Sequence, residues 1–245
     1  MRRIGFSTGA LAKGDFRKGI KLQEGRVNAL ELSALREDEL APLSEALATL
    51  NLSKFAYVSF HAPSQRARYT EAELVALLVK VAPYVRSIIV HPDIIENPVT
   101  WRPIEKSLVL ENMDQRKPIG RTAKELKSYF EALPDARFCF DIGHARQVDP
   151  TLSVAAEMLR VLVDRLAEVH ISEVDAASKH VSISRAAMKS FAGIASLIPQ
   201  SVPAIIESVI SPEAMDDEIR MARESLGEYT VARGTIGEKT LSSTK

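Results

Sequence analysis

The sequence lacks several features that would assign it to particular classes of protein. Its 245 residues include a single cysteine, Cys139, so no disulfide can form within the chain, and a lone buried thiol is typical of a reducing compartment. Thirty-two basic residues balance thirty-two acidic ones, so the basic excess common in proteins that grip DNA phosphates is missing. No apolar run is long enough to span a membrane, and no apolar segment follows Arg2 and Arg3 as it would in a secretory signal. We therefore expect a cytoplasmic protein without a membrane partner.

Short apolar runs alternate with amphipathic segments along the whole chain. Near-continuous apolar runs are typical of parallel strands covered on both faces. We predict eight strands, at Arg3–Ser7, Ala29–Ser33, Phe55–His61, Ser87–His91, Ser107–Asn112, Arg137–Asp141, Leu166–Ser172 and Pro203–Ser208. Helical spacing follows them, most clearly at Thr70–Val85, Arg121–Leu133, Leu152–Leu166, Ser184–Ile198 and Ser211–Leu226. The weakest predicted helix lies within Pro98–Lys106, where two prolines restrict it.

Eight strand–helix units in a chain of this length favour a closed barrel over an open sheet. We predict a single α/β domain at 1–230, a (β/α)₈ TIM barrel, because no linker or shift in composition divides the chain. The segment 231–245 is rich in Gly, Ser and Thr and is predicted to be a flexible tail.

Imidazoles and carboxylates gather at the predicted carboxyl ends of the strands, where barrels of this kind build their active sites. The histidines in these positions are His61, His91, His144, His170 and His180, and the acids are Glu31, Glu111, Asp141 and Glu207. One histidine or one acid at a strand end is more often a hydrogen-bonded structural residue than a ligand. Nine of them on one rim are better explained by a divalent cation that compensates the buried acids. Mixed nitrogen and oxygen ligands suit zinc, manganese, cobalt or iron better than magnesium.

Four short motifs, in this order and spacing, resemble the xylose isomerase-like barrel superfamily of sugar isomerases, epimerases and endonuclease IV-type AP endonucleases. They are Leu110-Glu111-Asn112, Asp141-Ile142-Gly143-His144, Val169-His170-Ile171-Ser172 and Ile206-Glu207-Ser208. The resemblance implies a metal site made of Glu111, Asp141, His170 and Glu207. It implies a second ion at His61 and His91 if the protein is of the endonuclease type. A third ion would use His144 and His180, but Ser178 stands where an Asp is expected, and whether Asp175 replaces it is open. We expect one to three ions of zinc, manganese or cobalt.

Two mechanisms follow from this resemblance, and a third interpretation involves no reaction. In an isomerase or epimerase, Glu111 and Glu207 would take and return a proton beside a metal-polarised carbonyl. In a phosphodiesterase, Glu111 would instead bridge two ions, and an activated water would attack phosphorus. The third interpretation is a barrel that binds metal or ligand without turnover.

The partner expected from the sequence is a small sugar or sugar phosphate, narrowly preferred over DNA because of the neutral charge and Ser178. Basic side chains in the predicted mouth loops can bind a phosphate, although such residues are more often simply solvated. They are Arg66, Arg68, Arg116, Lys179 and Arg185, and Glu31 is a further substrate-binding candidate. Association into a homo-oligomer is compatible with the fold, but no residue identifies an interface.

Overall fold

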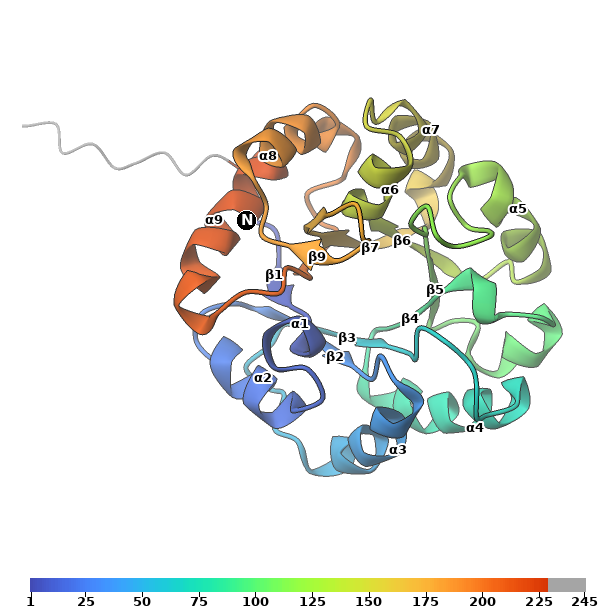
Figure 1. Ribbon diagram of the computed structural model, residues 1–245. Helices are drawn as coiled ribbons and strands as arrows, with labels where there is room; N and C mark the ends of the chain where they lie inside the picture. Colours follow the sequence, from blue (N-terminus) through green and yellow to red (C-terminus); the bar gives the residue numbers. More distant parts are fainter. Residues whose placement is uncertain (229–245) are drawn as a thin grey trace, which may run out of the picture.

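Eight parallel strands form a ring with helices around its outside, as a computed structural model shows for residues 1–228 (Figure 1). The strand order is β1-β10-β7-β6-β5-β4-β3-β2. Each barrel strand therefore pairs with the barrel strands that come before and after it along the chain. The predicted (β/α)₈ barrel is confirmed. The predicted tail at 231–245 and the last two residues of the predicted domain lie outside the described residues.

The bounds of the elements match the predicted strands to within two residues at most ends. The barrel strands are β1 (Ile4–Phe6), β2 (Ala29–Ser33), β3 (Tyr57–His61), β4 (Ser87–Val90), β5 (Leu108–Glu111), β6 (Arg137–Asp141), β7 (Leu166–Ile171) and β10 (Ala204–Ile206). The α-helices are α1 (Thr8–Ala12), α2 (Phe16–Gln23), α3 (Glu37–Ala46), α4 (Glu71–Val81), α5 (Ala123–Ala132), α6 (Ile142–Val148), α7 (Ser153–Leu162), α8 (Arg185–Ala192) and α9 (Met215–Ser225). Short 3₁₀ helices are η1 (Leu47–Thr49), η2 (Ala82–Tyr84), η3 (Pro92–Ile94), η4 (Pro98–Ile104), η5 (Val163–Arg165), η6 (Ala195–Leu197) and η7 (Pro212–Ala214).

Local sequence signals explain where the helices begin. The Thr70 hydroxyl accepts a hydrogen bond from the Glu73 amide, and the Glu73 carboxylate accepts one from the Thr70 amide, so α4 starts with a complete capping box. The segment after β4 forms only the 3₁₀ helices η3 and η4, because Pro103, inside η4, lacks the amide hydrogen that a regular α-helix uses there.

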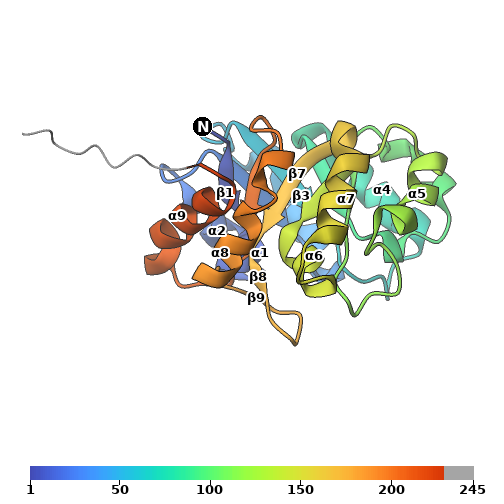
Figure 2. The same cartoon turned by 90° about the horizontal axis from the view of Figure 1, so that it is seen from above.

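The hairpin after β7 was not predicted. The two-residue strands β8 (Glu173–Val174) and β9 (His180–Val181) pair antiparallel in a hairpin directly after β7. Figure 2 shows this hairpin projecting from the barrel end opposite the N-terminus. It brings His180 back over the carboxyl ends of the strands.

The ring closes at a narrow seam between β1 and β2. One parallel bridge, Ser7 with Glu31, joins the two strands directly. The Ile4 and Phe6 amides on this side instead donate to the side chains of Asn28 (3.0 Å) and Gln23 (2.8 Å). Gly5 is required here, because a Cβ atom at this position would lie 1.8 Å from the carbonyl oxygen of Ala29.

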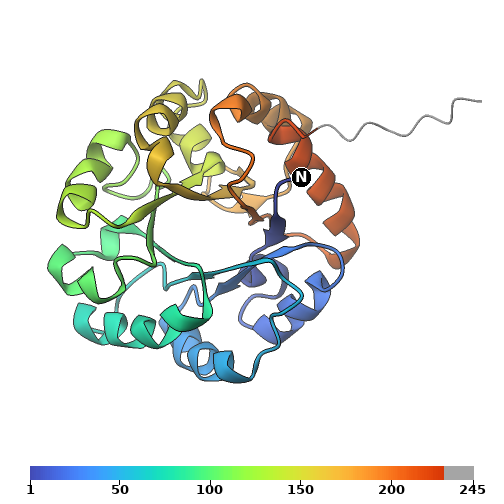
Figure 3. The ribbon, with the colours of Figure 1, turned by 180° about the vertical axis from the view of Figure 1, so that it is seen from behind.

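Strand alternation divides the apolar core into an outer shell and a barrel interior. Outward residues such as Leu110, Phe138 and Phe140 pack against the surrounding helices, which Figure 3 shows from the other side of the molecule. Fully buried residues such as Ile89, Val109 and Cys139 form a separate cluster inside the ring. Among the described residues, every helix is too short or too polar to cross a bilayer.

Candidate metal centre

Strand alternation also builds the site. Two residues beyond the buried interior cluster, toward the carboxyl ends of the strands, the next inward-facing side chain is polar on several strands. Val109 and Glu111 share a face of β5, as Cys139 and Asp141 do on β6. Asp141 pairs in register with His170 on β7. The predicted strand-end residues are therefore brought together at one level of the barrel.

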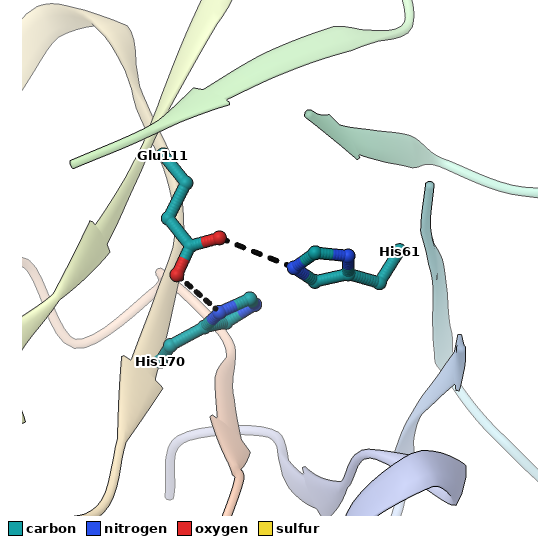
Figure 4. Close-up of side chains that lie close together, drawn as sticks. All are labelled: His61, Glu111 and His170. Atoms are coloured by element: carbon teal, nitrogen blue, oxygen red, sulfur yellow. Dashed lines mark hydrogen bonds and ion pairs between the residues drawn. The ribbon is translucent and has the colours of Figure 1, made fainter. Parts of the chain in front are cut away.

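Glu111 lies at the centre of this layer and is 1% exposed. Its Oε2 atom lies 3.2 Å from His61 Nε2 and 3.2 Å from His91 Nε2. Its Oε1 atom lies 3.3 Å from His170 Nδ1, on the other side of the carboxylate. Figure 4 shows Glu111 between the rings of His61 and His170, with one oxygen toward each. The two oxygens therefore face two separate sets of imidazoles.

Two groups of side chains with metal-ligating atoms meet at Glu111. The group Glu111, Asp141, His170 and Glu207 has one ligand atom per residue within 4.8 Å of the others, and so has the group His61, Glu111 and His170. His170 Nδ1 lies 3.4 Å from Glu207 Oε2, which ties β7 to β10 in the first group. The first group contains the four residues that the resemblance implies for the first ion. The second group contains His61, one of the two histidines implied for the second ion.

A third group contains Asp141, His144 and His180. His144 Nδ1 lies 3.6 Å from Asp141 Oδ2, and the two histidine rings pack edge to face with centroids 5.1 Å apart. Asp175 does not join them, because its Oδ1 accepts hydrogen bonds from the amides of Ala177 and Lys179 in its own hairpin turn.

The Asp141-Ile142-Gly143-His144 motif folds as a tight strand-to-helix turn. Asp141 caps α6 by accepting a hydrogen bond from the His144 amide at 2.6 Å, which leaves its second oxygen directed at the site. The Asn112 side chain holds the Asp141 backbone through two hydrogen bonds, at 2.8 and 2.9 Å. A Cβ at Gly143 would lie 2.6 Å from the Ser172 carbonyl oxygen, so this turn needs glycine to fit against β7.

Burial and charge set the protonation of the metal-free cluster. Burial raises the pKa of Asp141 to about 7, against the opposing effect of His144. Burial acts to lower the pKa of His61, but its hydrogen bond to Glu111 and the nearby acids outweigh this and raise the pKa to about 9. Burial would likewise raise the pKa of Glu111, yet the charge and hydrogen bond of His170 hold it well below its usual range. Protons on imidazoles thus compensate the buried acids.

A divalent cation fits the same place better. Asp141 Oδ2 and His91 Nδ1 are buried and have no hydrogen-bond partner within residues 1–228. A buried acceptor without a partner costs about 1–3 kcal/mol, and an ion coordinated by the carboxylate removes that cost. The mixture of imidazole nitrogens and carboxylate oxygens is the donor set that zinc, manganese and cobalt accept.

Comparisons with known proteins find similar folds among solved structures. No protein-family model matches the chain, and no curated protein matches it either. Endonuclease IV from Thermus thermophilus matches with a TM-score of 0.57 and 20% identity, over 93% of this chain and 100% of that one. The IOLI protein, solved with a zinc atom, matches with a TM-score of 0.60 and 11% identity, over 94% and 99%. A xylose isomerase-like TIM barrel protein from Mycobacterium smegmatis, solved with magnesium, matches with a TM-score of 0.55 and 11% identity, over 94% and 98%.

The chain shares the TIM-barrel fold of these solved structures. At these identities the likeness concerns the fold, and the reaction depends on this chain's own residues.

A cavity of about 760 Å³ opens above the cluster at the mouth of the barrel, a volume typical of small-molecule sites. His61, His91, Glu111, His144, His180 and Glu207 reach its floor and walls. Three basic side chains on the rim are each paired with an acid: Lys117 with Asp93 at 2.7 Å, Arg116 with Asp114 at 2.8 Å, and Arg66 with Glu96. The mouth therefore carries balanced charge.

The predicted phosphate-binding residues fall in different places. Arg66 and Arg116 line the cavity, whereas Lys179 and Arg185 are exposed and are not among the residues that line it. Arg68 is likewise exposed and lies outside the lining. Glu31 is fully buried below the cavity, with its Oε2 atom 3.1 Å from His170 Nε2.

Sequence reasoning missed several residues of the site. Asp114 and Lys117 line the cavity from the loop after β5, and a second acid three residues beyond Glu111 was the signal that could have found Asp114. Glu168, buried inside the ring, contacts His170 Nε2 at 3.0 Å. Its position two residues before His170 on a strand would have placed both side chains on one face.

Proposed function

We propose that the protein is a divalent-metal-dependent phosphoester hydrolase whose two ions share Glu111. The observation that carries this proposal is the divergence of the Glu111 oxygens, one toward His61 and His91 and the other toward His170. A one-ion isomerase would need neither His61 nor His91. It would also need Glu111 free to take a proton, and this carboxylate is buried among imidazoles.

The chain's residues have distinct parts in this proposal. Glu111 would hold both ions, Asp141, His170 and Glu207 would complete the first site, and His61 and His91 would complete the second. Bound divalent ions supply Lewis-acid stabilisation of phosphoryl charge and lower the pKa of water. His144 and His180, which line the cavity, can donate hydrogen bonds to a phosphate oxygen there.

The rim supports a role for basic residues in orienting the substrate. Lys117 Nζ also donates to the Ser64 carbonyl oxygen at 3.1 Å, so its ammonium group is fixed above the cavity by two acceptors. A substrate phosphate that reaches Lys117 would compete with Asp93 for it. Because the acids of the rim neutralise its bases, a compact substrate fits better than a long polyanion.

The second candidate is the metal-dependent sugar or sugar phosphate isomerase that the sequence narrowly favours. Glu111 and Glu207 both reach the small polar cavity, as two proton-transferring groups on either side of a sugar would. Metal content separates the two candidates, because the isomerase requires one ion and the hydrolase requires two.

The test measures zinc or manganese per chain together with two activities. Purified protein is assayed for hydrolysis of bis(p-nitrophenyl) phosphate and of an abasic DNA duplex, and for exchange of carbon-bound hydrogen with solvent in a panel of sugar phosphates. We expect two ions per chain and hydrolysis, one ion after His91→Ala, and a loss of at least about 10²-fold in hydrolysis in both His91→Ala and Glu111→Gln.

Glu173→Gln is the matched control, because Glu173 pairs with Arg146 outside the cluster and should leave metal content and rate unchanged. One ion per chain that is retained in His91→Ala, with solvent exchange of a sugar hydrogen, would establish the isomerase instead. Cleavage of the abasic duplex at a much higher rate than the small diester would identify DNA as the substrate.

A further inference from the structure

A buried carboxylate lies directly beneath the metal-ligand layer, on the same strand as one of the ligands. Glu168 and His170 are two residues apart on β7, so both side chains point into the barrel. Both are 0% exposed. We infer that Glu168 is a positioning residue that fixes the His170 ring with its Nδ1 atom toward the metal, an inference that rests on the metal site of the proposed function.

The two nitrogens of His170 have different surroundings. Nε2 donates a hydrogen bond to Glu168 Oε1 at 3.0 Å. Nδ1 lies on the opposite side of the ring, 3.3 Å from Glu111 Oε1 and 3.4 Å from Glu207 Oε2. A neutral imidazole carries one proton, so a proton held on Nε2 by Glu168 leaves the Nδ1 lone pair as the metal ligand.

Glu168 is itself held in place from a different strand. The Tyr57 hydroxyl donates to its Oε2 atom at 2.5 Å, and the Ser59 hydroxyl donates to its Oε1 atom at 3.1 Å. Within residues 1–228 its ion-pair partner is His170 alone. Two donors from β3 therefore fix the carboxylate independently of His170, and the carboxylate in turn orients the ring.

Two alternative roles for residues of this cluster are weaker. Glu31 Oε2 also lies 3.1 Å from His170 Nε2, but among the described residues the geometry of a hydrogen bond from this nitrogen to a carboxylate is met by Glu168 Oε1 and not by Glu31 Oε2. Cys139, Glu168 and His170 are close enough to hold an ion of their own. However, both Glu168 oxygens already accept hydrogen bonds, and the cluster is fully buried inside the ring.

The test uses cobalt as the probe, since its visible absorption reports the geometry of the ligands. Metal-stripped wild type, Glu168→Gln and Tyr57→Phe are titrated with Co²⁺, and the dissociation constants and spectra are compared. We expect Glu168→Gln to weaken one cobalt site by about 10–100-fold and to shift its spectrum, as loss of an outer-sphere partner does. Tyr57→Phe, which removes one donor to Glu168, should change both in the same direction by a smaller factor.

Glu71→Gln is the matched control, because Glu71 is a buried acid that accepts hydrogen bonds from Trp101 and from backbone amides away from the cluster. It should lower the melting temperature without changing the cobalt affinity. The inference is overturned if Glu168→Gln and Tyr57→Phe both bind cobalt as the wild type does. It is also overturned by a cobalt–thiolate absorption band in the wild type that Cys139→Ser removes. Wild type that binds no cobalt would instead refute the proposed function itself.

Discussion

The metal-free protein should lose stability as the pH rises from about 6.5 to 9, whereas the metal-loaded protein should not. The perturbation is removal of metal by a chelator, followed by a change of pH. The reason is that protons compensate the buried acids in the metal-free cluster, and a higher pH removes those protons.

The sign follows from two groups. The pKa of His61 rises from 6.5 to about 9 on folding, so its stabilising contribution is complete below pH 6.5 and is lost as the pH passes 9. The pKa of Asp141 rises from 3.8 to about 7, so its contribution is complete below pH 3.8 and is lost as the pH passes 7. Both groups therefore destabilise the metal-free fold in the alkaline direction.

The magnitude can be worked out from His61 alone. A rise in the pKa from 6.5 to about 9 corresponds to about 3.5 kcal/mol, at about 1.4 kcal/mol for each pKa unit. For a domain of this size each kcal/mol moves the melting temperature by about 2–4 °C, so the expected loss is roughly 10 °C. Bound metal reverses the dependence, because ligands must be deprotonated to coordinate it.

The assay is thermal melting followed by circular dichroism at several pH values from about 6 to 9, with chelator or with excess zinc. The variant His61→Asn, stripped of metal, should show a flatter profile than stripped wild type. A melting temperature of the stripped wild type that stays constant or rises over this range would refute the argument that imidazole protons compensate the buried acids.

Three further outcomes are expected. Ser178→Asp, which puts a carboxylate beside His180 at a position where φ is +54°, should raise the metal content by about one ion per chain in elemental analysis, since Asp tolerates this conformation. Gly5→Ala should destabilise the barrel by more than about 4 kcal/mol in chemical unfolding or prevent folding, because its Cβ would collide with the Ala29 carbonyl oxygen. Lys117→Met should weaken competitive inhibition by inorganic phosphate about tenfold or more while leaving the metal content unchanged, since Lys117 lies on the rim and not among the ligands.

The barrel could be predicted because its strands are short apolar runs with helical segments between them. The register of Asp141 beside His170 then follows from the fold, since parallel strands of a barrel end at one rim. The helix expected after β4 was the weakest prediction, and Pro103 inside it disfavours a regular α-helix, so the segment forms 3₁₀ turns. The β8–β9 hairpin was missed because two-residue strands leave no periodic pattern to read.

The ligand cluster could be predicted as a set, but not the contacts that surround it. The use of Asp175 in its own turn depends on backbone conformation, which the identity of neighbouring residues does not fix. The contact between Glu168 and His170 depends on which face of β7 points inward, and an acid inside a strand is more often at the surface. Lys179 and Arg185 were placed by loop membership alone, which says nothing about the direction of a side chain.

At the seam between β1 and β2, two side chains supplement the few backbone bonds that close the barrel. The Ile4 and Phe6 amides donate to the carboxamides of Asn28 and Gln23, so we expect these side chains to govern how well the two amides are protected against deuterium exchange. A substitution of Asn28 or Gln23, neither of which is a proposed metal ligand, would remove a hydrogen bond at the β1–β2 seam and leave the other strand pairs of the barrel intact. Closure of the barrel thus depends in part on residues that are separate in the sequence from the candidate metal ligands.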